Sequence, residues 1–207
     1  MIWTTLVTLI QLLGVFVGFV FTLTMGTGLL LSLHYTQRRS DHRADHVRLV
    51  IPTVAADHVR PALLETLEHT SEMFPEYELY CVLDEGSDLQ ADLVARDDVT
   101  AVVVPESFDC EAVAKGRAIQ YFVETVVAEA PHYWYGFVDD DNRILDDDFL
   151  YEIPYYEARG YRAMNPVLVP RQGNSLVTFM ADHIRYVDDR SIYRLFTGVL
   201  GTPYLGF

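Results

Sequence analysis

The sequence predicts an α/β protein in which helices flank a mostly parallel sheet, preceded by one N-terminal transmembrane helix. Three observations support this. From residue 47 to residue 138, short apolar runs alternate with longer runs of helical spacing, as in β-α-β units. The short runs are apolar on both faces, which is typical of strands covered on both sides. Residues 1–33 contain no Asp, Glu, Lys or Arg, and they exceed the roughly 20 residues that span a bilayer.

The first segment is better explained as a retained membrane anchor than as a cleaved signal peptide. A signal peptide begins with basic residues, has a shorter apolar core and ends at small residues. Here the start is uncharged, and residues 33–35 (Leu-His-Tyr) make a poor cleavage site. Basic residues only follow the segment, so the positive-inside rule places the rest of the chain in the cytoplasm. We therefore expect a single-pass cell-membrane protein with a juxtamembrane linker at residues 34–46 and one domain at residues 47–207.

Apolar runs and their breakers set the order of elements in that domain. Strands are expected where β-branched and aromatic residues cluster, at residues 47–51, 79–83, 100–104 and 133–138. Helices are expected between them, at residues 61–74, 89–95 and 110–130. Proline bounds several of these runs because it lacks a backbone donor, at Pro52, Pro75, Pro105 and Pro131.

After the fourth expected strand the pattern weakens. Residues 144–156 are expected to form a helix or a turn that packs back on the sheet, and residues 163–169 another strand, interrupted by a proline. Residues 175–183 fit either a strand or a helix. The end of the chain, residues 191–207, is apolar and aromatic. Either this tail packs on the membrane or the core, or the polypeptide stops short of its natural end.

Composition excludes some functions. The formal net charge is −15 and no basic patch is visible, so no nucleic-acid partner is expected. Acidic residues are spread along the chain and Lys115 is the only lysine. This composition resembles proteins of salt-loving organisms, and it explains the net charge without a partner. Cys81 and Cys110 are expected to be reduced in a cytoplasmic domain, and neither has neighbours at zinc-ligand spacing.

The aromatic run at residues 133–138 leads directly into Asp139, Asp140 and Asp141. Three carboxylates cannot be buried unpaired, because desolvating one charge already costs several kcal/mol. In an open α/β sheet, ligands bind just beyond the carboxyl ends of the strands. We therefore expect Asp139 and Asp141 to bind Mg²⁺ or Mn²⁺, which prefer oxygen ligands, and through the ion a diphosphate. The alternative, an acidic surface loop, fits residues 146–148 better.

Four features, taken in order, resemble glycosyltransferase family 2, whose catalytic domain has the GT-A fold. They are the strand end at Ile51-Pro52-Thr53, the turn at Asp84-Glu85-Gly86-Ser87, the helix start near Lys115 and Arg117, and Asp139-Asp140-Asp141. The match covers roughly residues 47–150 and depends on the ordered set rather than on any one motif. Glu85 stands where the family typically has a second Asp. The resemblance implies that residues 47–207 form a GT-A domain.

The resemblance also implies a role for the first two features. Pro52 and Thr53 would line the pocket for the nucleotide of a nucleotide-diphosphate sugar. Asp84 and Glu85 would accept hydrogen bonds from the base or its ribose, a task that suits carboxylates. The alternative for Asp84 and Glu85 is an ordinary turn of Asx/Gly type.

The other two features would hold the diphosphate. Lys115 and Arg117 would meet its oxygens, or alternatively lie on a solvated helix face. Asp139 and Asp141 would bind the divalent metal, which neutralises charge on the leaving nucleoside diphosphate. Asp140 would point elsewhere, toward the sugar.

Family 2 transfer typically inverts the anomeric carbon and uses a carboxylate to deprotonate the acceptor hydroxyl. The later acidic motif that usually supplies this base, and the Gln/Arg-x-x-Arg-Trp-like element after it, have no clear match here. The available carboxylates are Asp182, Asp188 and Asp189, and Asp182 is the candidate base. A phosphate acceptor is already anionic and needs no base, so a lipid-phosphate acceptor fits as well.

We therefore expect a membrane-anchored glycosyltransferase that moves a sugar from a nucleotide-diphosphate sugar to a lipid-linked or glycan acceptor. Two alternatives stay open. A nucleotidyltransferase typically has a glycine-rich loop after its first strand, whereas residues 52–56 contain no glycine. A non-catalytic, membrane-tethered nucleotide-sugar-binding or scaffold module is favoured by the lack of an evident base.

Overall fold

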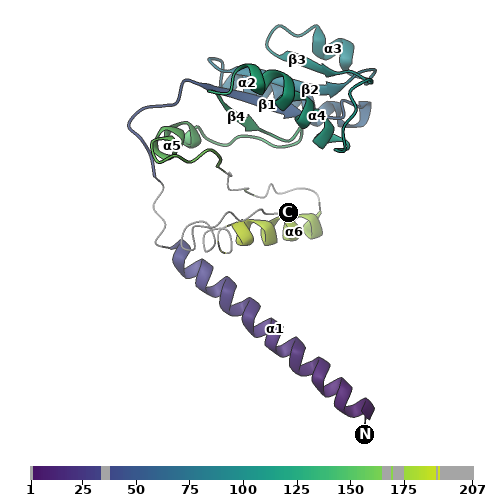
Figure 1. Cartoon of the computed structure of the whole chain (residues 1–207), viewed down its shortest axis with the longest axis vertical. Helices are drawn as coiled ribbons and strands as arrows, with labels where there is room; N and C mark the ends of the chain where they lie inside the picture. Colours follow the sequence, from purple (N-terminus) through teal and green to yellow (C-terminus); the bar gives the residue numbers. More distant parts are fainter. Residues whose placement is uncertain (1, 34–37, 165–168, 170–174, 190, 192–207) are drawn as a thin grey trace. The chain divides into compact units, whose positions relative to one another are not determined.

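Figure 1 shows the computed structural model of the chain, which describes residues 2–33, 38–164, 169, 175–189 and 191. The chain divides into two compact units: one is Arg39–Gly160, and the other combines Met1–Arg38 with Tyr161–Phe207. The elements in order are α1 (Ile2–Ser32), β1 (Val47–Pro52), η1 (Asp57–Val59), α2 (Arg60–Met73), β2 (Glu78–Asp84), α3 (Gln90–Val94), β3 (Thr100–Val104), α4 (Lys115–Phe122), η2 (Val123–Val127), β4 (Trp134–Phe137), α5 (Asp148–Glu157) and α6 (Leu176–Asp188).

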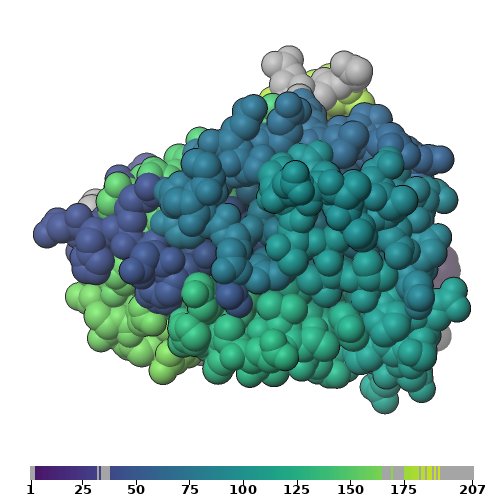
Figure 2. Space-filling model, turned by 90° about the horizontal axis from the view of Figure 1, so that it is seen from above, coloured from purple at the N-terminus to yellow at the C-terminus, as the bar shows by residue number. Residues whose placement is uncertain are grey.

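The Arg39–Gly160 unit contains a four-stranded sheet with the strand order β3-β2-β1-β4, and every pair is parallel. This confirms the predicted α/β class and the parallel sheet, and such a sheet is consistent with a Rossmann-like fold. Each strand lies within a residue or so of its predicted range, because the apolar runs and their breakers mark strand ends well. In the space-filling view, the teal segments of this unit pack side by side over much of the visible face (Figure 2).

Both faces of the central strands are buried, as their apolar composition predicts. Side chains alternate between the faces along a strand. Val50 and Tyr80 contribute to a core cluster with Phe122 of α4, while Leu49 and Ile51 on the opposite face are also almost completely buried. Edge-on ring contacts join Phe122 to Tyr80, with ring centroids 5.3 Å apart, and favour this packing. Helix α4 therefore covers one face of the sheet.

Some predicted helices have different boundaries. The helix expected from residue 110 begins only at Lys115 and continues into the π-helical turn η2. The reason is Ala114, whose φ of 50° and ψ of −131° are incompatible with a helix. Helix α5 covers the later part of the stretch expected at residues 144–156 and contains Pro154. For residues 175–183, the structure selects the helical alternative, α6.

The strand expected at residues 163–169 is not found among the residues that the structure describes. Residues 163, 164 and 169 belong to no helix or strand, and residues 165–168 lie outside the described part. The predicted tail at residues 191–207 also lies outside it, except for Ser191.

Helix α1 is the one helix of the described residues that is long and apolar enough to cross a membrane, and none of its most apolar window is buried. Its 31 residues correspond to about 46 Å of helix, more than the roughly 30 Å of a hydrocarbon core. Thr8, Thr22 and Thr24 each donate a hydroxyl hydrogen bond to the carbonyl four residues earlier. Their hydroxyl groups are therefore satisfied within the helix, as an apolar environment requires.

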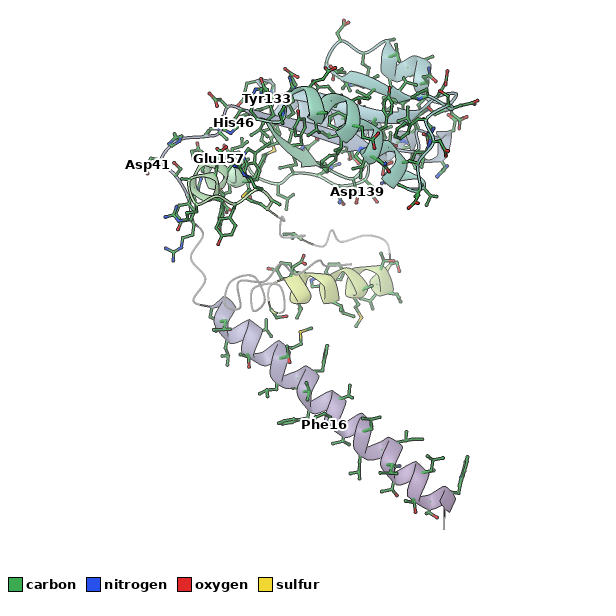
Figure 3. The ribbon with its side chains drawn as sticks, in the orientation of Figure 1. Phe16, Asp41, His46, Tyr133, Asp139 and Glu157 are labelled. Carbon is green, nitrogen blue, oxygen red and sulfur yellow. The ribbon has the colours of Figure 1, made fainter. Side chains whose placement is uncertain are left out.

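Residues 39–46, here called the juxtamembrane segment, pack against α5 within the Arg39–Gly160 unit. The contacts are Ser40 N to Tyr151 O (2.8 Å), Ala44 N to Leu150 O (2.8 Å), Arg39 to Asp148 (3.0 Å) and His46 Nε2 to Glu157 Oε2 (3.2 Å). Figure 3 shows His46 and Glu157 beside each other. The polar composition of this segment predicts a linker, but its backbone is hydrogen-bonded to a helix rather than only to solvent.

Candidate functional site

The candidate site lies where β1, β2 and β4 end. Thr53 follows β1, Asp84 is the last residue of β2, and Asp139 comes two residues after β4 ends at Phe137. The strand ends are staggered by two residues each: β4 ends opposite Val50, β1 ends at Pro52 opposite Val82, and β2 continues to Asp84. In a parallel sheet such ends meet at one edge, which is where ligands bind in open α/β folds. Asp139 is labelled in Figure 3.

Asp140 is the buried member of the acidic triplet, with 6% of its surface exposed. Its Oδ2 accepts a hydrogen bond of 2.6 Å from the Thr53 hydroxyl, and its Oδ1 accepts one of 2.7 Å from Lys115 Nζ. The Thr66 hydroxyl donates to its backbone carbonyl at 3.2 Å. A buried carboxylate is stable only when it is paired and hydrogen-bonded, and both oxygens of Asp140 meet this condition.

Lys115 joins two carboxylates. Its Nζ also donates to Asp139 Oδ1 at 3.1 Å. Burial by itself would lower the pKa of Lys115, but the hydrogen bonds to Asp140 and Asp139 outweigh burial and raise the pKa above the usual lysine value. The Asp139 side chain is 56% exposed. Thr53, Lys115, Asp139 and Asp140 are called the strand-end network from here on.

Arg117, two residues after Lys115 in α4, makes a second set of contacts. Its Nη1 donates to Asp84 Oδ1, and its Nη2 donates to the carbonyls of Pro105 at 2.6 Å and Phe108 at 3.1 Å. This guanidinium therefore ties the loop after β3 to the end of β2. The arrangement fits a residue that positions Asp84 better than one that is free to grip a phosphate.

The turn after β2 has the geometry that its sequence predicts. Gly86 has a φ of 78°, a conformation that favours glycine, and its N–H donates to Gln90 Oε1 at 2.7 Å. Glu85 turns toward the end of β3, where its carboxylate accepts a hydrogen bond of 2.9 Å from the Glu106 N–H. Asp84 and Glu85 thus point to different partners.

Two alanines near the network have positive φ angles. Ala55, at 46°, donates its N–H to Thr53 Oγ1 at 3.1 Å, and Ala114, at 50°, directly precedes Lys115. Such angles cost of order 1–3 kcal/mol for a residue other than glycine, and they gather at functional sites. Sequence reasoning missed both alanines, as it missed the contact from Thr66, because neither residue type signals such a conformation or role.

Other predicted site residues lie apart from these contacts. Pro52 is buried as the last residue of β1. Asp141 is exposed. Asp182 belongs to α6, in the unit that contains α1, and its side chain lies outside the described part of the chain. Its assignment as a base stays a prediction.

Two carboxylate oxygens lie close together beside Lys115. Asp139 Oδ1 and Asp140 Oδ1 both lie within hydrogen-bond distance of one cationic atom, Lys115 Nζ, so two hard oxygen donors converge on a single point. Mg²⁺ typically uses one or two carboxylates together with phosphate and water oxygens. Among the described residues, no three or more His, Cys, Asp or Glu side chains form a ready metal-binding group. The residues present would hold an ion only with help from a ligand or water.

Searches of protein-family models, of curated proteins and of solved structures found no match. The chemistry of this site therefore rests on its own residues and on the resemblance of its motifs. What the fold shows is an α/β unit with a four-stranded parallel sheet, and one apolar N-terminal helix of membrane-spanning length.

Proposed function

We propose that this chain is a membrane-anchored glycosyltransferase with a GT-A domain, which transfers a sugar from a nucleotide-diphosphate sugar to an acceptor. The observation that carries the proposal is the pairing of residues from separate motifs at one sheet edge. Lys115 bonds to Asp140, which bonds to Thr53, and Arg117 bonds to Asp84. Four motifs that are far apart in the sequence thus form two connected groups of charged and polar side chains.

In this proposal the donor lies across the strand ends. Asp84, positioned by Arg117, accepts hydrogen bonds from the base or ribose. Asp139, with Asp140 or Asp141, would hold Mg²⁺ or Mn²⁺, whose positive charge would stabilise the leaving nucleoside diphosphate. Lys115 provides a second positive charge close to the diphosphate oxygens, while Thr53 fixes Asp140.

The expected membrane anchor favours a particular class of acceptor. The N-terminal helix is long and apolar enough to cross a membrane, so in this proposal it would keep the domain close to a bilayer. The arginines that follow it favour the cytoplasmic side. A lipid-linked or glycan acceptor is expected there. Asp182 stays the candidate base for a hydroxyl acceptor, whereas a lipid phosphate would need none.

Donor binding to the full chain, held in detergent or nanodiscs, tests the proposal. We expect one member of a panel of nucleotide-diphosphate sugars to bind in calorimetry with Mn²⁺ present. The binding should be lost in the Asp139→Ala/Asp141→Ala variant and weakened in Asp84→Asn. Asp97→Ala is the matched control, since it removes an exposed carboxylate elsewhere. No binding by any donor, or equal binding by all variants, would reject the proposal.

One observation favours a non-catalytic binding module as the second candidate. Lys115 and Arg117 are already paired with carboxylates of the chain itself, so their charge serves the fold as well as a ligand. A binding module and an enzyme are separated by incubating the chain with the bound donor and measuring release of the nucleoside diphosphate. Release above the rate of the Asp139→Ala/Asp141→Ala variant supports the enzyme.

A further inference from the structure

Lys115 Nζ lies beside the carboxylates of both Asp139 and Asp140, to which the proposed function assigns a divalent ion. This nitrogen is 2.7 Å from Asp140 Oδ1 and 3.1 Å from Asp139 Oδ1. A Mg²⁺ ion lies about 2.0–2.1 Å from its oxygen ligands, so an ion shared by these two oxygens would come into contact with Nζ. Two cations so close repel strongly, the more so because water is partly excluded.

We propose that Lys115 and a divalent metal ion exclude each other at Asp139 and Asp140, so that metal binding displaces the ammonium. Without metal, Lys115 neutralises the buried Asp140. With metal, the ion takes over this task and the ammonium is released toward solvent. Where the metal arrives with a nucleotide-diphosphate sugar, as the proposed function requires, the released ammonium becomes available to the phosphate oxygens.

The structure indicates which partner moves. Apart from Lys115, two contacts hold Asp140 in place: Thr53 donates to its carboxylate and Thr66 donates to its backbone carbonyl. The Lys115 side chain is 36% exposed and has four rotatable bonds, so it can swing into solvent once the ion neutralises Asp140 in its place. Exchange therefore needs no rearrangement of the sheet edge.

Competition of this kind weakens metal binding. If the paired state holds about nine-tenths of the molecules, the apparent dissociation constant for metal is raised about tenfold. Lys115→Met removes the competitor and keeps a side chain of similar length, so this variant should bind Mn²⁺ about tenfold more tightly than the wild type. Lys115→Arg keeps a competing cation and should not gain affinity.

The chain offers a direct probe because Lys115 is its only lysine. Full-length protein in detergent is treated with an amine-acylating reagent, and the peptide that contains Lys115 is quantified by mass spectrometry. Mn²⁺ alone should increase acylation of Lys115, with a midpoint at the dissociation constant measured by calorimetry. Sodium chloride of equal ionic strength is the control. In Asp139→Asn, which keeps the Lys115–Asp140 pair, Mn²⁺ should change the acylation much less.

The outcomes separate this inference from the proposed function. Mn²⁺ that binds while Lys115 stays protected would overturn the exclusion, and so would a Mn²⁺ affinity of Lys115→Met equal to that of the wild type. Absence of Mn²⁺ binding in both proteins would overturn it too. Because these measurements use the metal without a donor, release of Lys115 together with no donor binding would leave the exclusion standing and reject the glycosyltransferase.

Discussion

The strand-end network and the juxtamembrane segment both contain ion pairs, but the paired carboxylate is buried in the network and exposed or half-buried in the segment. In the network, Asp140 is 6% exposed and has a partner for each carboxylate oxygen. In the segment, Arg39 and Asp148 pair across 3.0 Å with side chains 43% and 32% exposed. An exposed pair contributes about 0–1 kcal/mol, whereas breaking a fully buried one costs about 3–5 kcal/mol. Stability is therefore concentrated in a few buried contacts at the strand-end network and spread over several weaker contacts in residues 39–46.

The juxtamembrane segment is also held by contacts other than ion pairs. Two backbone hydrogen bonds join it to α5, and the Tyr77 hydroxyl donates to the Ala44 carbonyl at 2.6 Å. The Arg39 guanidinium also lies over the Tyr151 ring, 4.8 Å from its centroid, a contact worth about 0.5–1 kcal/mol when exposed. Loss of one charge there leaves the other contacts in place.

The largest difference between the two regions is expected when one cation is removed from each. Lys115→Met leaves the buried Asp140 without its countercharge, which should lower the free energy of unfolding by about 2–3 kcal/mol. This is less than for a fully buried pair, because the lysine is partly exposed and water can replace it. Urea unfolding measures the loss, with Arg39→Met as the control in the segment. Equal losses in the two variants would contradict the comparison.

The Thr53 hydroxyl tests whether Asp140 also depends on a neutral hydrogen-bond donor. Thr53→Val keeps the shape of the side chain but removes the 2.6 Å hydrogen bond to Asp140, leaving a buried acceptor unsatisfied. We expect a loss of about 1–3 kcal/mol in urea unfolding. Thr53→Ser retains the hydroxyl and should lose less. If Thr53→Val is as stable as Thr53→Ser, then Asp140 does not depend on this donor.

A smaller difference in stability, between the wild type and Lys115→Met, is expected when the pH is raised. The folded state raises the pKa of Lys115 above the ordinary value of 10.5, because hydrogen bonds to Asp140 and Asp139 outweigh burial. A raised pKa means that the stabilisation is complete below pH 10.5 and is lost as the pH rises through the folded-state value. Between pH 10 and pH 12, the wild type should therefore lose more stability than Lys115→Met, as followed by circular dichroism at each pH. Parallel pH profiles would argue against the pair.

The smallest effect is expected in the juxtamembrane segment itself. Arg43 lies 2.9 Å from Glu76 and 3.6 Å from Asp147, with its side chain exposed to a similar degree as its partners. Arg43→Met should cost no more than about 0.5–1 kcal/mol, and 1 M salt should remove most of the difference from the wild type. A loss above 2 kcal/mol that resists salt would show that this region depends on one contact after all.

The sequence predicted most of the fold because the relevant signals are local. The β3 range of Thr100–Val104 coincides with the predicted strand, and Gly86 has the positive φ that a glycine in such a turn suggests. Helix α4 was placed too early because its start depends on the backbone of Ala114. An alanine in a helical pattern carries no signal for a positive φ.

Within the candidate site, the sequence by itself determined which strands end in charged residues and that these residues share one edge of the sheet. Only the tertiary structure decided that Asp140, rather than Asp139 or Asp141, faces inward. That choice depends on the turn after β4 and on partners that are 25 residues away at Lys115 and 87 residues away at Thr53. Strand periodicity ends with the strand, so the direction of each later carboxylate is set by the donors that the packed fold brings to it.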